Sequence, residues 1–328
     1  MHMSDALLSP ATAGVMYAAS GAAVAVSVMK LRRSIVPVKV ADAGVMGAFV
    51  FAAQMVNFAI PGTGSSGHIC GGMLLSAVLG PFLGFLTLAG VLVVQCLLFA
   101  DGGILAFGAN LWNMAFYGCL LGGGMIWPLA LRGEVSRGKI FAACIAGNVV
   151  ALQLGAFSVT LQTLASGVTE LPFGAFVAVM QPIHFVIGAV EGAITASVLC
   201  FILESRPEML ALRSRPSSSR FSRIAVLSVL AASAFSIGGL LSLAASSSPD
   251  GLEWSMRRVA GTTELDRAGA AHLKASQVQD KVAVLPDYAL PDSDAVGGNV
   301  LSGLLGTGIV LALCAAGAYG IGRRRAKA

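Results

Sequence analysis

Charged residues are scarce in this chain of 328 residues: Asp, Glu, Lys and Arg make up 11%, while 56% of the residues are hydrophobic. A soluble domain carries about twice that charged fraction. The mean hydropathy is +0.82, and the 40 glycines suit helices whose backbones approach closely inside lipid. The composition therefore predicts an all-α, polytopic membrane protein, and it excludes an ordinary soluble domain.

Several chemical signatures are also missing. The six cysteines are scattered without a CxxC spacing, which is typical of small buried hydrophobic residues and not of disulfides or a thiolate metal site. No GxxxxGK[ST] phosphate loop occurs, so nucleotide hydrolysis by that route is excluded. The N-terminus lacks the basic region, apolar run and cleavage site of a signal peptide. We therefore expect Met1 to be the first residue of the mature protein.

Apolar runs and the basic clusters between them predict seven membrane spans in residues 1–205. The spans are 11–29, 40–60, two arms of a hairpin within 69–100, 111–131, 140–165 and 173–203. The basic clusters are Lys30, Arg32, Arg33 and Lys39; Arg132, Arg137 and Lys139; and Arg206, Arg213, Arg215, Arg220 and Arg223. The positive-inside rule places these clusters in the cytoplasm, and the N-terminus consequently outside.

A second unit follows a basic, Ser-containing linker at residues 206–223. Residues 224–328 hold two further spans, 224–245 and 299–321, which are separated by a polar external loop at 246–298. The basic tail at 323–327 again falls on the cytoplasmic side. We therefore expect a seven-helix body with two additional C-terminal transmembrane helices.

A Gly- and Ser-rich break at residues 54–72 carries His68, one of four histidines. A bilayer tolerates such a break only where the freed main-chain groups face protein or a water-filled cavity. A histidine in this position indicates a ligand site reachable from outside. A surface loop whose histidine meets water explains the stretch equally well.

The first two residues provide a possible chelating unit. The Met1 amine, the His2 amide nitrogen and the His2 imidazole can close two adjacent rings on one metal ion, and His68 can occupy the fourth corner. A planar set of nitrogen donors suits Ni(II) or Cu(II), with Co(II) possible by affinity, and does not suit Zn(II), Mg(II) or Ca(II). Spacing alone does not distinguish this unit from an ordinary start codon followed by a polar residue.

Four other polar residues are candidates for hydrogen bonds around a ligating imidazole. They are Asn57, Asp101, Asn110 and Asn113, which lie near the outer ends of predicted spans. Helix capping also explains Asp101.

Three further ionisable residues lie elsewhere. His184 and Glu191 are seven positions apart and share a helix face. A proton relay or a contact to a partner is possible there, but a buried pair that satisfies itself is favoured. His272, in the external loop, is expected to be solvated.

Taken together, the motifs resemble those of a known family. The opening MHMSD, the run QMVNFAIPGTGSSGHICGGMLLSAVLGP at 54–81, and LFADGGILAFGAN at 98–110 with Asn113-Met114 resemble the nickel/cobalt substrate-binding membrane subunits of energy-coupling-factor (ECF) transporters. The similarity covers about residues 1–205. One departure is Met3-Ser4-Asp5-Ala6, where the family more usually continues Ile-Pro-Asp-Gly. The later SPDGLEW at 248–254 and LPDY at 285–288 resemble the small two-span PDGLE-type accessory subunit, here fused.

This resemblance implies the substrate-specificity component of an ATP-driven importer of Ni(II) or Co(II), the latter for cobalamin synthesis. It implies that Met1, His2 and His68 hold the metal, and that the metal is a transported substrate with no further cofactor. It also implies a multi-pass protein of the cell (inner or plasma) membrane that is not itself an enzyme. The implied partners are a transmembrane coupling subunit and two cytoplasmic ATPases, with no nucleic acid.

The fusion favours nickel over cobalt. An ATP-independent secondary carrier or channel is the alternative from another class. A metal sensor would require a cytoplasmic signalling domain, and no such domain is recognisable in the sequence.

Overall fold

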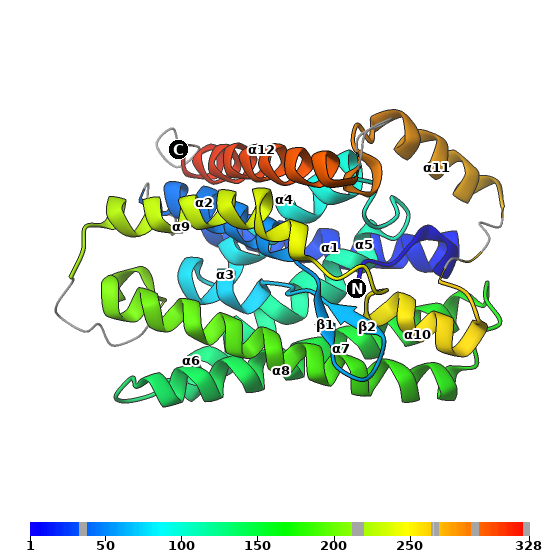
Figure 1. Ribbon diagram of the computed structural model, residues 1–328, viewed down its shortest axis with the longest axis horizontal. Helices are drawn as coiled ribbons and strands as arrows, with labels where there is room; N and C mark the ends of the chain where they lie inside the picture. The colour runs from blue at the N-terminus through cyan, green and yellow to red at the C-terminus, as the bar shows by residue number, and fades with distance from the viewer. Residues whose placement is uncertain (33–37, 212–219, 264, 266–268, 290–294, 324–328) are drawn as a thin grey trace.

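The computed structural model describes residues 1–32, 38–211, 220–263, 265, 269–289 and 295–323. Its regular structure is a helical bundle with one small sheet (Figure 1). This arrangement confirms the predicted all-α, polytopic membrane fold. Arg33, Arg213 and Arg215, together with the tail residues 324–327, lie outside the described residues.

Within the described residues, the body contains seven helical segments at the places where spans were predicted. They are α1 (Pro10–Leu31), α2 (Val38–Gln54), α3 (Gly72–Leu79), α4 (Pro81–Leu98), a continuous helix made of α5 (Phe107–Asn110), η2 (Leu111–Ile126) and α6 (Trp127–Ala130), α7 (Arg137–Ser166) and α8 (Phe173–Ser205). The break between α3 and α4 falls at Gly80-Pro81, as predicted. Because α3 has 8 residues, it is too short to cross a bilayer by itself.

Hydroxyl side chains define where several helices begin. Ser9 precedes Pro10 and accepts a hydrogen bond from the Thr12 amide, while Ser136 caps α7 in the same way. Proline is well suited to the first helical position because its missing N–H would have no partner there. These local signals are why the helix starts agree closely with the sequence-based boundaries.

The second span is shorter than predicted, because α2 ends at Gln54 and not near residue 60. The chain then forms a hairpin of β1 (Phe58–Ile60) and β2 (Ser65–Gly67), with Ala59 opposite Ser66. Gly62 and Gly64 in its turn have φ of +76° and +73°, a conformation that favours glycine. The Gly/Ser-rich break is therefore an ordered hairpin that leads directly into His68.

The appended unit places two helices beside α2. Its elements are α9 (Arg223–Gly239), η4 (Leu241–Ala244), α10 (Gly251–Ala260), α11 (Ala270–Val282), η5 (Pro286–Tyr288) and α12 (Ala295–Arg323). Two short segments complete the chain, η1 (Asp5–Leu7) and η3 (Pro207–Met209). Helices α9 and α12 both pack on α2, and Arg223 of α9 forms an ion pair with the buried Asp42 of α2. The helices α10 and α11 were not predicted within the external loop.

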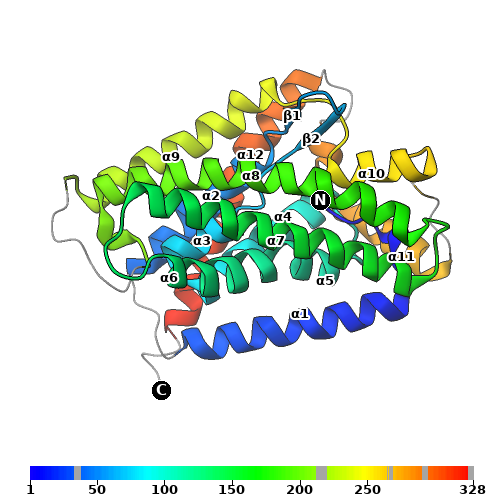
Figure 2. The ribbon, with the colours of Figure 1, turned by 90° about the horizontal axis from the view of Figure 1, so that it is seen from below.

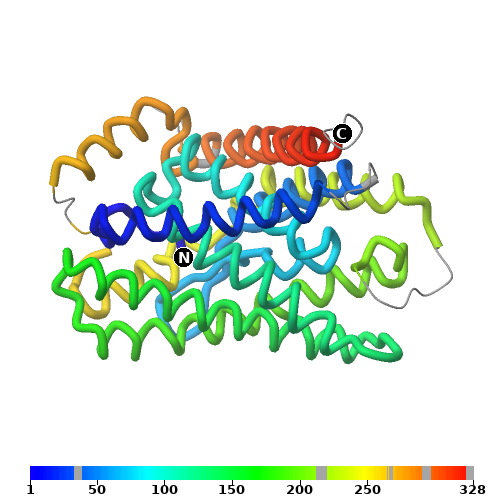
Figure 3. The backbone as a smooth tube through the Cα atoms, turned by 180° about the vertical axis from the view of Figure 1, so that it is seen from behind, coloured from blue at the N-terminus to red at the C-terminus, as the bar shows by residue number. Residues whose placement is uncertain are grey.

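The two ends of the bundle differ. Helices α10 and α11, the β-hairpin and the N-terminus gather toward one end, whereas α6 and the start of α9 lie at the other (Figures 1 and 2). Helix α1 runs along the surface of the bundle (Figure 3), with 22% of its apolar window buried. Five helices, α1, α4, α7, α8 and most of α12, are long and apolar enough to span a membrane among the residues described.

Candidate metal centre

The N-terminal segment enters the bundle and is held there by its main chain. Met1 is 5% exposed and Met3 is fully buried. The Met3 amide donates to Asn110 Oδ1 at 2.7 Å, and the Met3 carbonyl accepts from Asn110 Nδ2 and from the Gly103 amide. A Cβ on Gly103 would lie 1.8 Å from Asp5 Oδ1, so only glycine permits this approach. Asn110 therefore orients the segment that carries the first two residues.

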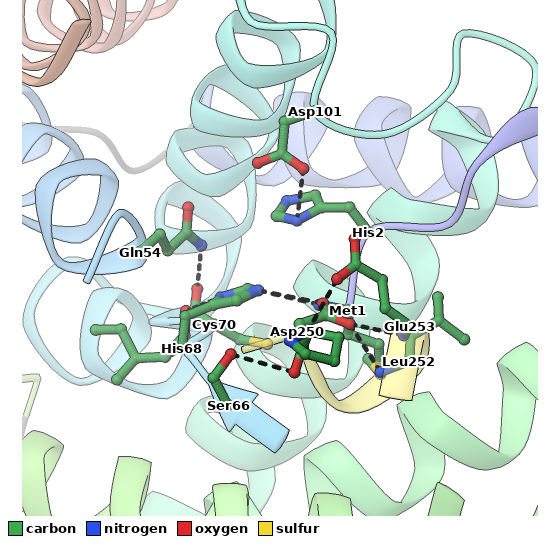
Figure 4. Close-up of polar contacts among 12 residues, drawn as sticks. Met1, His2, Gln54, Ser66, His68, Cys70, Asp101, Asp250, Leu252 and Glu253 are labelled. Atoms are coloured by element: carbon green, nitrogen blue, oxygen red, sulfur yellow. Dashed lines mark hydrogen bonds and ion pairs between the residues drawn. The ribbon is translucent and has the colours of Figure 1, made fainter. Parts of the chain in front are cut away.

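Met1, His2 and His68 converge at one buried place (Figure 4). The Met1 amine nitrogen lies 3.0 Å from His68 Nε2, and the rings of His2 and His68 stack with centroids 5.4 Å apart. His68 Nδ1 lies 3.0 Å from the Ile69 carbonyl. A carbonyl can only accept, so Nδ1 carries the hydrogen and Nε2 presents its lone pair toward the amine. Fixing one ring nitrogen by a main-chain carbonyl is typical of metal-ligating histidines.

Two carboxylates contact these nitrogen atoms. Asp250 Oδ2 lies 2.6 Å from the Met1 amine and 3.9 Å from His68 Nε2. Asp101 Oδ1 lies 3.2 Å from His2 Nδ1. The site thus combines nitrogen atoms from the body with a carboxylate from the appended unit.

The electrostatics of the site follow from burial and these pairings. Burial lowers the pKa of His68 to about 3, and the neighbouring Met1 ammonium and His2 act in the same direction. Burial likewise lowers the pKa of His2, although Asp101 opposes the shift. Burial alone would lower the pKa of the Met1 amine, but Asp250 outweighs it and raises that pKa. Near neutral pH, the His68 imidazole is therefore neutral, whereas the Met1 amine keeps its proton.

Two glutamine side chains, Gln95 and Gln54, form a chain of hydrogen bonds that begins at His2. His2 Nε2 lies 3.2 Å from Gln95 Oε1, and Gln95 Nε2 donates to Gln54 Oε1 at 2.8 Å. Gln54 Nε2 in turn donates to the Cys70 carbonyl at 2.9 Å. This chain of hydrogen bonds connects the His2 ring with the main chain just after His68.

The start of α10 is docked on the hairpin that leads to His68. The Ser66 amide donates to the Pro249 carbonyl at 2.8 Å, and Trp254 Nε1 donates to the Thr63 carbonyl at 3.0 Å. Asp250 caps α10, because its Oδ1 accepts from the Leu252 and Glu253 amides. The cap fixes Oδ1 and leaves Oδ2 directed at the Met1 amine.

A polar cavity of about 580 Å³ lies between the body and the appended unit. His2, His68 and Asn57 line it, together with five acidic residues and, among the described lining residues, no Lys or Arg. The acidic residues are Asp5, Asp101, Asp250, Glu253 and Asp287. The cavity therefore joins both imidazoles to a negatively charged space.

The four candidate hydrogen-bonding residues occupy different positions. Asp101 contacts His2, and Asn110 holds Met3, as described above. The Asn113 side chain is 2% exposed and exchanges two hydrogen bonds with Gln162. The Asn57 carbonyl accepts from the Ser246 amide at 2.8 Å. Of the four, only Asp101 contacts a histidine ring.

The predicted pairing of His184 with Glu191 is wrong. His184 Nδ1 contacts the Met180 carbonyl of its own helix at 2.8 Å, while Glu191 accepts from the Cys70 and Gly71 amides. His184 Nε2 is buried without a hydrogen-bond partner, and His184 lines a small cavity beside Met1, His68 and Asp250. Although the two side chains belong to the same helix, they do not contact each other, because His184 contacts the Met180 carbonyl and Glu191 accepts from the Cys70 and Gly71 amides.

The expectation for His272 is also wrong. Its side chain is 3% exposed, and its Nε2 lies 2.8 Å from the Leu8 carbonyl. The polar surrounding sequence suggested solvent, whereas α11 folds back over the N-terminal segment. His272 thus helps to cover that segment.

Sequence reasoning did not single out four residues that contribute to the site. Asp250 lies 249 positions from the amine that it contacts. Tyr288 donates to Asp101 Oδ2 at 2.7 Å, and the Gln54–Gln95 pair supports His2. The available signals were the motifs that contain three of them: PDGLE around Asp250, LPDY around Tyr288 and the run at 54–81, which begins with Gln54.

Comparison with known proteins places these features in context. Residues 2–209 match the family described as cobalt uptake substrate-specific transmembrane region, and residues 224–323 match the PDGLE domain. A protein of Archaeoglobus fulgidus, by name a fused nickel transport protein NikMN, is 34% identical over 95% of this chain and 96% of its own length. The fused nickel transport protein NikMN of Rhodobacter capsulatus is 32% identical over 66% of each chain.

Among solved structures, a truncated transition metal transporter superposes with a TM-score of 0.54 at 31% identity. The match covers 62% of this chain and 99% of that one. On the strength of the match over residues 2–209, the chain belongs to the family of the cobalt uptake substrate-specific transmembrane region.

Proposed function

We propose that this protein is the substrate-binding membrane component of a transporter that imports Ni(II), or Co(II), from outside the cell. The proposed ligands are the Met1 amine, the His2 amide nitrogen and imidazole, and His68 Nε2. The observation that carries the proposal is the convergence of Met1 N and His68 Nε2, 3.0 Å apart in a buried place, beside the ring of His2. Four nitrogen donors of this kind suit a square-planar ion.

Binding the ion exchanges existing contacts for metal–nitrogen bonds. His68 Nε2 already presents a lone pair, so it ligates without losing a proton. The Met1 amine must lose a proton, and the His2 amide must also be deprotonated, so that binding releases protons. His2 Nδ1, which completes the second chelate ring, must exchange Asp101 for the ion. Asp101 and Asp250 then remain nearby as negative charges that compensate the cation.

The proposed orientation places the site at the outer face. By their positions in the sequence, the described basic residues Lys30, Arg32, Lys39, Arg132, Arg137 and Lys139 lie at or near the α1–α2 and α6–α7 connections. The end of α1 and the start of α7 lie at the end of the bundle opposite α10 and α11 (Figures 1 and 2). By the positive-inside rule, that end is cytoplasmic. The N-terminus and the acidic cavity of about 580 Å³ then face outward, where they can receive cations.

The proposed domain division is a substrate-binding body at 1–205, a cytoplasmic linker at 206–223 and an accessory unit at 224–328. Movement of the ion to the cytoplasm is proposed to depend on a transmembrane coupling subunit and two ATPases, as the resemblance to ECF transporters implies. Nickel is favoured over cobalt because the relatives that share the fused arrangement are named as nickel transport proteins.

The test is a metal titration of the purified, detergent-solubilised protein, either intact or with one alanine added ahead of Met1. The intact protein is expected to bind one Ni(II) or Co(II), whereas the extended protein loses high-affinity binding because its first nitrogen no longer lies at the site. A variant with one alanine after Ala328 is the matched control. Thermal unfolding without added metal checks that the extended protein is folded.

Equal binding by the intact and extended proteins would overturn the amine-anchored site.

Transport in vesicles distinguishes an ATP-driven transporter from a secondary carrier or channel. Metal uptake by this protein alone, without ATPase subunits, would favour the secondary carrier or channel instead.

A further inference from the structure

Glu191 contacts the main chain that follows His68. Its side chain is 0% exposed and lies in the middle of α8. Its Oε2 accepts from the Cys70 amide at 2.9 Å and its Oε1 from the Gly71 amide at 2.8 Å. These amides are two and three residues beyond His68, so one carboxyl group accepts hydrogen bonds from two consecutive peptide groups of the loop.

The loop presents both amides in one direction because of its backbone conformation. Gly71 has φ of +77° and precedes α3, and consecutive N–H groups in such a turn form a concave site for an anion. A Cβ at Gly71 would lie 2.4 Å from Val50 Cγ1, which restricts this position to glycine. Glu191 supplies the acceptor oxygens from a different helix.

Helix α8 is itself held tightly where Glu191 projects. Gly188 and Gly192 flank Glu191, and added Cβ atoms there would lie 2.9 Å from Val149 Cα and 2.5 Å from Ile145 Cα of α7. The two helix backbones therefore touch on both sides of Glu191. Close-packed interiors transmit displacement, so the position of α8 determines the position of the Glu191 carboxylate.

The Cys70 peptide is also held from the opposite side. Gln54 Nε2 donates to the Cys70 carbonyl at 2.9 Å and belongs to the hydrogen-bond chain that reaches His2 through Gln95. The supports of both imidazoles thus meet at Cys70. If the hydrogen bonds from the Cys70 and Gly71 amides to Glu191 change, the main chain next to His68 moves. The hydrogen-bond chain through Gln54 and Gln95 then carries this movement to the His2 ring.

We propose that Glu191 is a positioning residue for His68, holding the loop so that the imidazole meets the metal ion and connecting the site with α8. This inference rests on the proposed function, because it assigns a support to one of the proposed ligands. The α8 helix is then the element through which a movement inside the membrane changes the geometry of the site.

The experiment compares Glu191→Ala and Glu191→Gln with the intact protein in a Ni(II) titration. The absorption spectrum of the bound ion is recorded in each case. Loss of a residue that orients a metal ligand lowers affinity by about 10–100-fold, and we expect this range for Glu191→Ala together with a shifted ligand-field band. Glu191→Gln retains one acceptor oxygen and is expected to fall between. Glu204→Gln is the matched control, since Glu204 lies on the same helix in an exposed ion pair with Arg137.

Unchanged affinity and an unchanged spectrum in Glu191→Ala would overturn the proposal. If that variant does not fold, Glu191→Gln decides by amide hydrogen exchange over residues 68–72 without metal. Faster hydrogen exchange at residues 68–72 than in the intact protein, together with a shifted absorption spectrum of bound Ni(II), supports the proposal. Exchange rates and a spectrum that both equal those of the intact protein overturn it. Failure of the intact protein to bind Ni(II) would reject the proposed function first, whereas equal binding by all variants rejects only the role of Glu191.

Discussion

The body and the appended unit contribute different chemistry to the same place. The nitrogen atoms of the proposed metal site all come from the body, from Met1, His2 and His68. The appended unit contributes oxygen atoms, the Asp250 carboxylate at the Met1 amine and the Pro249 carbonyl at Ser66. Its one histidine, His272, contacts the Leu8 carbonyl. Under the proposed function, the body would ligate the ion while the appended unit holds the ligating segments in position.

The largest expected effect is a loss of Ni(II) affinity, and it should distinguish two buried histidines, His68 of the body and His272 of the appended unit. His68→Ala is expected to lower Ni(II) affinity by more than about 100-fold, beyond the range for residues that only support a ligand. His272→Ala removes one contact to the N-terminal segment, and its cost is about 1–3 kcal/mol of folding free energy. Metal titration and thermal unfolding of both variants measure these effects.

The two histidine variants are informative as a pair. We expect His68→Ala to remain folded and lose binding, and His272→Ala to retain binding within about 10-fold. If His272→Ala loses binding as completely as His68→Ala, the appended unit does more than hold the segment. Retained high-affinity binding in His68→Ala would remove His68 from the ligands.

An intermediate effect is expected at Asp250, and it appears as a pH dependence. Asp250 raises the pKa of the Met1 amine, and the amine must lose its proton to bind metal. Without the carboxylate, burial dominates and that pKa falls. In Asp250→Asn, the pH at which Ni(II) binding is half-maximal should therefore move to lower pH by about 1 unit, the lower end of the range for a close opposite charge.

Ni(II) titrations between pH 5 and 9 measure this shift. Glu253→Gln is the control, because Glu253 belongs to the same cap of α10 while Asp250 contacts the amine. A midpoint that stays constant or moves to higher pH in Asp250→Asn would show that the carboxylate does not govern the proton on the amine.

Local signals explain why much of the fold was predictable. The apolar runs, the basic clusters and Gly80-Pro81 each act over a few residues, so spans and breaks could be read in order. The proposed chelation by Met1 and His2 is equally local, since the proposed donors are neighbours in the chain. The motifs and the predicted topology also suggested that His68 approaches the N-terminus, because both were expected at the outer face of the membrane.

The contacts that depend on tertiary packing could not be derived in this way. No pattern in the sequence indicates that Asp250 reaches the Met1 amine, since that depends on how α10 docks on the hairpin. The same limit applies to Glu191, whose partners Cys70 and Gly71 lie in another segment of the chain, whereas His184 contacts the Met180 carbonyl of its own helix. Hairpin pairing between Ala59 and Ser66 was hidden because strands of 3 residues carry too little alternation to be recognised.

The smallest expected effect concerns Tyr288, which lies one contact further from the ion. Its hydroxyl donates to Asp101 Oδ2 at 2.7 Å, and Asp101 Oδ1 contacts His2 Nδ1 at 3.2 Å. Tyr288→Phe removes this hydrogen bond and leaves the ring stacked on Phe99, so Asp101 loses one restraint while the packing remains. Ni(II) affinity should fall by less than about 10-fold, below the usual effect of residues that contact a ligand directly.

Tyr319→Phe is the matched control, because Tyr319 also belongs to the appended unit and its side chain is 56% exposed. Parallel Ni(II) titrations of the two variants measure the difference. A loss in Tyr288→Phe as large as that in His68→Ala would contradict the division between a ligating body and a holding unit, because an appended residue two contacts from the ion would then control its binding. A small loss confined to Tyr288→Phe would instead place the Tyr288–Asp101 pair among the contacts that hold His2 before the ion arrives.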